Sequence, residues 1–139
     1  MVDEARLDQL EAGLTPVSDG WFVVNVRDGA WVTNEAIGAA FTIEGDDALF
    51  PDVGFTLAVL RPGQATMYHR EANQEDFLVL AGECLLLIEG ESGRSRRGTS
   101  CTAVDRSRPA PRRQICVFWP CGSVHLVLLC IALRAVEAE

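Results

Sequence analysis

The sequence predicts an all-β fold, a sandwich, jelly roll or barrel, formed by one domain that covers all 139 residues. Short segments rich in Val, Ile, Phe, Leu and Trp recur along the chain, and turn-forming pairs such as Asp28-Gly29 and Pro62-Gly63 separate them. Hydrophobic residues make up 48% of the chain and charged residues 23%, which is typical of a folded globular domain. A chain of this length forms one sizeable core and is short for two.

The first expected element is a short helix over residues 3–12, within an N-terminal arm that covers residues 1–20. Leu7 and Leu10 lie three positions apart among charged residues, which favours a helix, and Gly13 is a helix-terminating residue. After this helix the sequence predicts strands over residues 21–26, 30–33, 38–43, 55–60, 75–80, 83–89, 115–119 and 124–133. Many short strands with regular turns are typical of barrels and jelly rolls.

The balance of charge changes near residue 92. Residues 1–91 carry 17 acidic side chains and four arginines, whereas residues 92–139 carry three acidic side chains and eight arginines. Seven of those eight lie in residues 92–113, which show neither the alternation of a strand nor the apolar stripe of a helix. We therefore expect an arginine-rich, solvated loop between two strands. A basic patch for an anionic ligand or nucleic acid is an alternative, but the segment has no interleaved aromatic residues on which bases stack.

The whole chain has a net charge of −8, which disfavours nucleic acid as a partner, because binding to a phosphate backbone depends on Lys and Arg. The acidic N-terminus lacks the basic and apolar regions of a signal peptide, and the longest apolar runs are far shorter than the roughly 20 residues of a membrane span. The five cysteines form no C-x-x-C pair, so we interpret them mostly as reduced, apolar fillers. These features predict a cytoplasmic protein with no membrane or nucleic-acid partner.

The strongest chemical signal is a histidine and two glutamates close together in the chain. On a strand, side chains two positions apart face the same side, so His69 and Glu71 are expected to project together. Glu75 begins the next strand, which is expected to run back beside the first, so that one imidazole and two carboxylates converge. The turn at Gly82 is expected to close a hairpin with the strand that follows. The alternative is a solvated hairpin face, on which Arg70 is the counter-ion of the two glutamates.

This segment resembles the first motif of the cupin superfamily, G-x5-H-x-H-x3-4-E-x6-G. The match is at Gly63, His69, Glu75 and Gly82, with Glu71 in place of the second histidine of the motif. The resemblance implies the cupin fold, a double-stranded β-barrel or jelly roll, here with the short N-terminal helix. It also implies that His69, Glu71 and Glu75 hold one divalent metal ion. Two carboxylates beside an imidazole favour Fe, Mn or Zn, since a carboxylate is a harder ligand than imidazole.

A weaker match to the second motif of the family, G-x5-P-x-G-x2-H-x3-N, lies near the C-terminus. Pro120, Gly122 and His125 are in register with it, whereas Gln114 and Leu129 replace its first glycine and its asparagine. The chain has two histidines, and both fall on ligand positions of the two motifs. The resemblance therefore implies His125 as a fourth metal ligand. The alternative is that His125 is a hydrogen-bonded core histidine.

The function implied by the resemblance is to bind or transform a small polar or anionic molecule at a metal ion in the barrel. The alternative is a non-catalytic ligand-binding or sensor protein, or one whose site has decayed, since cupin folds carry many unrelated activities and the fold alone does not choose among them. We also expect a homodimer, because small cupins commonly pair and the apolar β surface is large for 139 residues.

A change of reading frame is a third interpretation of the residues after 92. All twelve basic residues are arginine, which fits a gene of high GC content, and out-of-frame translation of such a gene tends to give Arg, Ser, Pro, Ala and Cys. Read one nucleotide upstream, the codons for residues 93–103 permit RPLPAWDFVHC, which resembles what one cupin subgroup carries after its first motif. On this interpretation the tail is a sequencing or cloning variant, and we expect His125 to lie outside the cavity.

Overall fold

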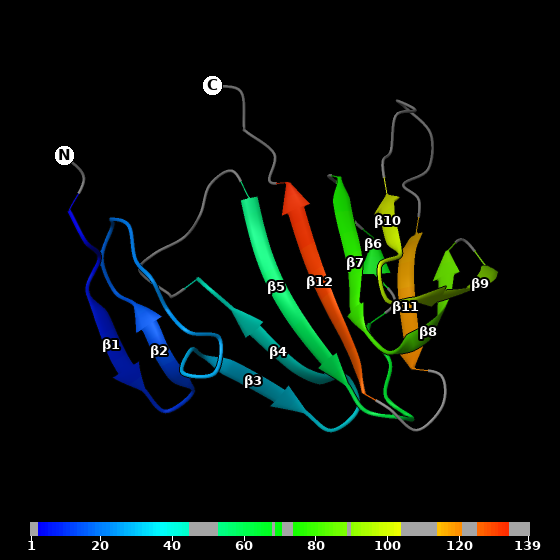
Figure 1. The fold of residues 1–139 in the computed structure, drawn as a ribbon, viewed down its shortest axis with the longest axis horizontal. Coiled ribbons are helices and arrows are strands. Elements are labelled where there is room, and N and C mark those ends of the chain that lie inside the picture. Colours follow the sequence, from blue (N-terminus) through cyan, green and yellow to red (C-terminus); the bar gives the residue numbers. More distant parts are fainter. Residues whose placement is uncertain are drawn as a thin grey trace.

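The computed structural model describes residues 3–44, 53–67, 69–70, 74–88, 90–103, 114–120 and 125–133. Every regular element in this part of the chain is a strand (Figure 1). The same residues include no helix that is long and apolar enough to cross a membrane. The predicted all-β fold is therefore confirmed.

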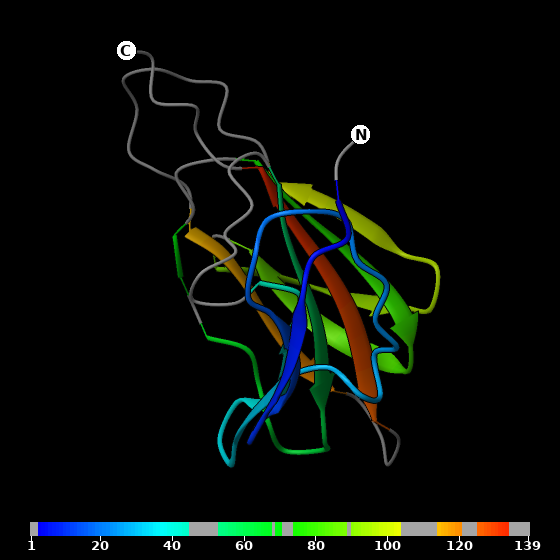
Figure 2. The same ribbon diagram turned by 90° about the vertical axis from the view of Figure 1, so that its left-hand side faces the viewer.

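The strands that the structure describes form three antiparallel sheets, ordered β1-β2, β10-β7-β12-β5-β4-β3 and β6-β11-β8-β9. The four-stranded sheet lies at one end of the six-stranded sheet and the β1–β2 hairpin at the other (Figure 1), and β5, β12 and β7 run side by side along the large sheet (Figure 2). In chain order the strands are β1 (Leu7–Leu10), β2 (Gly13–Pro16), β3 (Trp31–Asn34), β4 (Gly38–Thr42), β5 (Val53–Leu60), β6 (His69–Arg70), β7 (Glu75–Ala81), β8 (Glu83–Ile88), β9 (Glu91–Arg96), β10 (Ser100–Ala103), β11 (Gln114–Pro120) and β12 (Leu126–Leu133).

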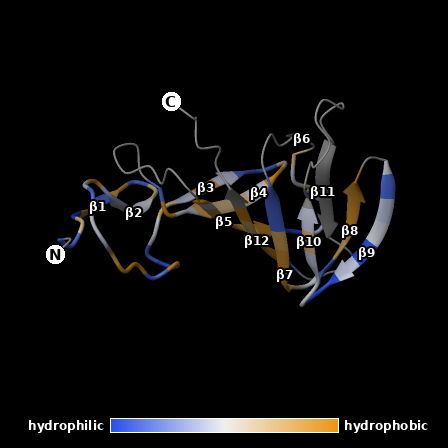
Figure 3. Cartoon of the chain, turned by 90° about the horizontal axis from the view of Figure 1, so that it is seen from above, coloured by the Kyte–Doolittle hydropathy of each residue, from blue (hydrophilic) through white to orange (hydrophobic). Residues whose placement is uncertain are grey.

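The core lies between the two larger sheets. Alternate residues of β7 and β12, namely Phe77, Val79, Leu126 and Leu128, pack in one cluster with Cys84 of β8, and each of the five is at most 6% exposed. Burying a large apolar side chain contributes roughly 1.5–3 kcal/mol. Figure 3 shows β8 and β12 as mainly hydrophobic and β9 as mainly hydrophilic. These inward faces therefore hold the two sheets together.

Gly82 carries the chain from the large sheet to the small one. β7 ends at Ala81 and β8 begins at Glu83, but the two strands belong to different sheets, so the expected hairpin is wrong. The φ of Gly82 is 84°, in the left-handed region that glycine adopts without a steric penalty. A Cβ atom at this position would lie 2.5 Å from the backbone oxygen of His125. Glycine therefore allows the corner to pack directly against the residue that precedes β12.

The expected N-terminal helix is wrong, because the chain forms the β1–β2 hairpin there instead. Leu7 is half-buried and Leu10 is 50% exposed, so the pair makes no buried helical stripe. The segment before the hairpin pairs with a distant one, since the backbone N–H of Ala5 donates to the carbonyl of Trp21 at 2.8 Å. Non-local hydrogen bonds of this kind override a weak local helix preference.

The other expected strands have mixed outcomes. Residues 21–26 form no strand, since Trp21 makes only an isolated bridge to Glu4 and Val23 is 81% exposed. The strands that were expected from residue 30 onward are all found, each within two residues at either end. These seven strands have strong apolar content, which is why the sequence pattern places them correctly.

The prediction of an arginine-rich loop over residues 92–113 is wrong for its first half, because β9 and β10 lie there. Residues 104–113 are outside the described residues. β9 pairs with β8, and β10 pairs with β7. In β9 the inward-facing Ser95 is 6% exposed, whereas Arg94 and Arg96 are exposed. Ser95 is the one buried residue of β9 and it is polar, and hydrophobic periodicity cannot reveal such a strand.

Candidate functional site

The inner face of the large sheet forms one wall of a cavity of about 350 Å³. Leu128, Ala58, Ala40 and Val32 are successive cross-strand partners on β12, β5, β4 and β3, and all four line the cavity. Side chains that are direct partners in a sheet lie on the same face. The two alanines in the middle of this row are small, which leaves space above this face of the large sheet, beside the packed core.

Glu75, at the start of β7, is the acidic side chain that lines this cavity within the described part of the chain. Burial alternates along β7, so Glu75 shares the inward face with Phe77 and Val79, and it is 6% exposed. The thiol of Cys130, on the neighbouring strand β12, donates a hydrogen bond to Oε1 of Glu75 at 2.8 Å. A buried carboxylate requires hydrogen-bond partners, and the thiol supplies one of them.

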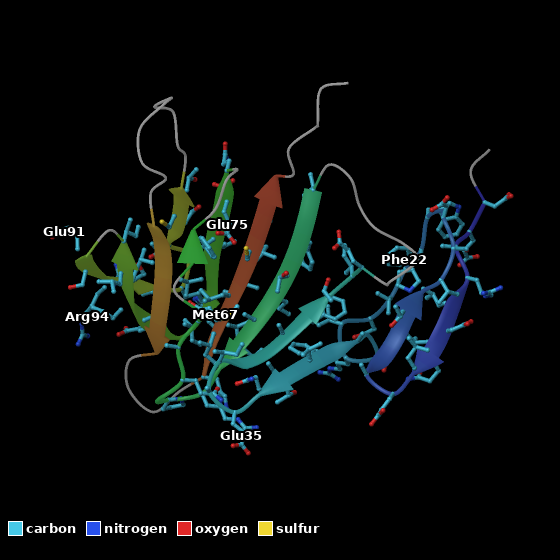
Figure 4. All side chains as sticks on the ribbon, turned by 180° about the vertical axis from the view of Figure 1, so that it is seen from behind. Phe22, Glu35, Met67, Glu75, Glu91 and Arg94 are labelled. Atoms are coloured by element: carbon cyan, nitrogen blue, oxygen red, sulfur yellow. The ribbon has the colours of Figure 1, made fainter. Side chains whose placement is uncertain are left out.

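The segment that follows β5 brings Thr66 and Met67 to the cavity. Gln64 fixes this segment, because its Nε2 donates to the backbone oxygen of Glu35 at 2.8 Å, in the turn between β3 and β4. Met67 is 63% exposed, so it lies where the cavity meets the surface. Figure 4 marks the positions of Met67, Glu35 and Glu75.

His69 and Glu75 belong to opposite sheets. β6 pairs with β11 through His69 and Ile115, which puts His69 in the small sheet, whereas Glu75 is in the large sheet. The expectation that the strand of Glu75 runs beside the strand of His69 is therefore wrong, although the two sheets still face each other. Glu71 and the side chain of His69 lie outside the described residues.

The structure does not bring His125 to Glu75. His125 is exposed and directly precedes β12, beside Gly82. The register of β12 on β7 pairs Val127 with Ala81, whereas Glu75, at the other end of β7, pairs with Ala132. Six residues of strand span about 20 Å, far more than two bonds of roughly 2 Å to one ion can bridge.

The position of His125 outside the cavity lining agrees with an out-of-frame reading of the residues after 92, whereas β9 and β10 do not agree with the poorly ordered segment that such a reading also implies. β12 nevertheless supplies core residues, because Leu126 is fully buried and Leu128 is 2% exposed. Apolar composition is sufficient for that role, since a strand that is hydrophobic and of suitable size packs in many sequence contexts. The contribution of β12 to the core therefore does not give His125 a role at the cavity.

A divalent metal ion would need more donors than the described residues supply. Within the ranges that the structure describes, no group of three His, Cys, Asp or Glu side chains is close enough to hold a metal ion. Glu75 and Cys130 offer one oxygen and one sulfur donor, and the thiol binds a metal only after it loses its proton. The described residues leave His125 far from Glu75, and the other two predicted ligands, His69 and Glu71, have side chains outside the described residues.

Cys130 is a candidate site residue that the sequence analysis did not single out. It was interpreted only as an apolar filler, yet its thiol contacts the buried carboxylate. A signal was present, because Leu126, Leu128 and Cys130 alternate along one strand and so share its inward face. The partner of that thiol, however, lies 55 positions away in the sequence and depends on the pairing of β12 with β7.

No family model matches this sequence, and no curated protein matches it. Solved structures do resemble it. A structure described as a predicted oxalate decarboxylase from Thermotoga maritima has a TM-score of 0.64 and 17% identity, covering 82% of this chain and all of that one. An uncharacterised Klebsiella pneumoniae protein with a double-stranded β-helix domain has a TM-score of 0.63 and 14% identity, covering 84% of this chain and 92% of its own.

A third neighbour, a sugar phosphate isomerase of the cupin superfamily from Silicibacter pomeroyi, has a TM-score of 0.54 and 15% identity over 70% of this chain. The present chain spans 59% of that protein's length and 61% of a similarly named protein from Acidithiobacillus ferrooxidans. The chain thus has the double-stranded β-helix fold of the cupin superfamily.

Proposed function

We propose that this protein binds a small molecule in the cavity on the inner face of its large sheet, with Glu75 as the charged contact. The observation that carries the proposal is a carboxylate only 6% exposed on the wall of a 350 Å³ cavity whose other walls are mainly apolar. Ligand sites commonly combine apolar walls with a few placed polar groups, in volumes of about 300–1,000 Å³. This supports the ligand-binding alternative without assigning a reaction.

Titration with a library of small fragments, followed by amide NMR, is expected to move the signals of Thr56, Ala58 and Leu128, which line the cavity. Ala40→Phe is expected to abolish these shifts, because Ala40 faces the cavity and the added ring fills it. Thr33→Phe is the matched control, since Thr33 is exposed on β3 and does not line the cavity. Shifts that persist unchanged in Ala40→Phe would contradict the proposal.

A second candidate function is a mononuclear divalent-metal site at His69, Glu71 and Glu75. It is supported by Glu75, the carboxylate of the first motif, which faces the cavity. His69 would approach from the facing sheet, since β6 and β7 belong to different sheets. An ion held there would supply Lewis-acid chemistry, and Fe, Mn or Zn suits such a mixed nitrogen and oxygen donor set.

We also propose that the protein is a homodimer in which the outer faces of the large sheets meet. Leu57, Leu129 and Leu78 are successive cross-strand partners on that face and are half-buried, and Leu80 beside them is 40% exposed. Light scattering is expected to give twice the chain mass of 15.1 kDa. Leu129→Glu is expected to give monomers, whereas Leu85→Glu, an equally polar change on the small sheet, keeps the dimer. A monomeric wild type at micromolar concentration would overturn this proposal.

A further inference from the structure

Among the described residues, the cavity lining has no basic side chain, whereas two of the similar structures are named for sugar phosphate and oxalate chemistry. The arginines whose side chains the structure describes, namely Arg6, Arg27, Arg61, Arg94, Arg96 and Arg97, are all exposed and none lines the cavity. Protein sites for phosphate and carboxylate depend on Arg, Lys or helix N-termini. The described residues contribute none of these groups to the cavity.

The cavity walls instead favour a ligand whose main part is apolar. Val32, Ala40, Ala58, Phe77 and Leu128, all on the large sheet, line the space with carbon atoms. Transfer of apolar surface from water to such a wall is favourable in proportion to the area buried. A cavity of ~150 Å³ already accepts one benzene ring in another protein. The present cavity, at about 350 Å³, is large enough for a ring with a substituent.

The acidic part of the lining is where Glu75 and Cys130 meet, while Asn34 and Thr66 add neutral polar groups elsewhere on the walls. Thr56 is the cross-strand partner of Cys130 on β5 and lines the same part of the cavity. A carboxylate oxygen accepts hydrogen bonds, so a ligand group that donates one, a hydroxyl or an amine, is stable beside it. An anionic group at this position would face a buried carboxylate and lose its hydration.

From the apolar walls and the polar region at Glu75, we infer that the ligand is a compact hydrophobic molecule with one hydroxyl or amino group beside this carboxylate. The inference rests on the proposed function and gives the class of its ligand. A metal ion at Glu75 would change which group binds the hydroxyl or amino group of the ligand, but it would leave the apolar walls as they are. The preference for a ligand with a large apolar part therefore holds for both candidate functions.

The test uses three probes on the protein as purified: benzyl alcohol, glucose and glucose 6-phosphate. Amide NMR titrations are expected to show benzyl alcohol binding at least about ten-fold more tightly than either sugar, because its ring replaces water at the apolar walls. Nuclear Overhauser contacts are expected between the ring protons and the methyl groups of Ala40, Ala58 and Leu128. Ala40→Phe is expected to remove benzyl alcohol binding, and Thr33→Phe to retain it.

Glucose 6-phosphate binding as tightly as benzyl alcohol would overturn the inference. Ring contacts confined to residues outside the cavity would overturn it as well, and this readout uses only the wild-type chain. If other fragments shift the cavity signals but benzyl alcohol does not, the ligand class is wrong while the proposed function stands. If no fragment shifts them, the proposed function and the inference both fail.

Discussion

Gly82→Ala is expected to lower the free energy of unfolding by about 2–5 kcal/mol, the sum of a backbone and a packing effect. The left-handed φ of 84° costs an L-residue about 1–2 kcal/mol. The new methyl group would also lie 2.5 Å from the backbone oxygen of His125, and backbone atoms cannot rotate away as a side chain does. Overpacking of this kind costs about 1–3 kcal/mol. Urea denaturation followed by tryptophan fluorescence measures the change.

Gly63→Ala is the matched control for this prediction. Gly63 has nearly the same φ, 88°, but a Cβ atom there would have no heavy atom within 4 Å. Gly63→Ala is therefore expected to lower the free energy of unfolding only by the backbone contribution, about 1–2 kcal/mol. Equal losses in the two variants would show that the contact between Gly82 and the residue before β12 is not as tight as described.

His69→Ala and Glu75→Gln are expected to reduce affinity for a divalent metal by more than about 100-fold if the second candidate function is correct. Loss even of a residue that only orients a ligand typically costs 10–100-fold, so loss of a ligand costs more. Elemental analysis of protein purified without chelators measures the metal content of each variant. Unfolding curves of the same samples separate a lost ion from a lost fold.

His125→Ala is the control for the metal variants, because His125 is exposed at the opposite end of β7 from Glu75. It is expected to keep the metal content of the wild type. Glu83→Gln is a second control, since Glu83 is exposed on the small sheet and outside the cavity lining. Equal metal in all four variants would exclude the site at His69, Glu71 and Glu75, whereas loss in His125→Ala would contradict the placement of that histidine.

Those parts of the fold with a strong apolar pattern were predictable from the sequence. β5, β7, β8 and β12 combine apolar residues with turn signals, and their bounds differ little from the expected ones. The inward position of Glu75 at the start of β7 was also predictable, because the motif places this carboxylate at the start of a strand. Local pattern and long-range packing favour the same structure in these segments.

The parts that sequence reasoning missed depend on which strands become neighbours. Nothing local shows that β7 and β8 lie in facing sheets, since a strand–Gly–strand pattern fits a hairpin equally well. Sequence spacing likewise could not place His125, whose distance from Glu75 follows from the register of β12 on β7. The hydrogen bond between Cys130 and Glu75 also depends on the register of β12 on β7.

The arginines of β9 have a consequence for solubility. β9 lies at the edge of the four-stranded sheet in the described structure, where unpaired backbone groups could recruit a strand from another molecule. Charged side chains on such an edge oppose that pairing, because bringing two copies together would place like charges side by side. Arg94 and Arg96 are exposed there, and Arg94 pairs only loosely with Glu83, at 3.8 Å. These arginines make β9 hard to detect from a hydrophobic pattern, and the same charges oppose aggregation at that edge.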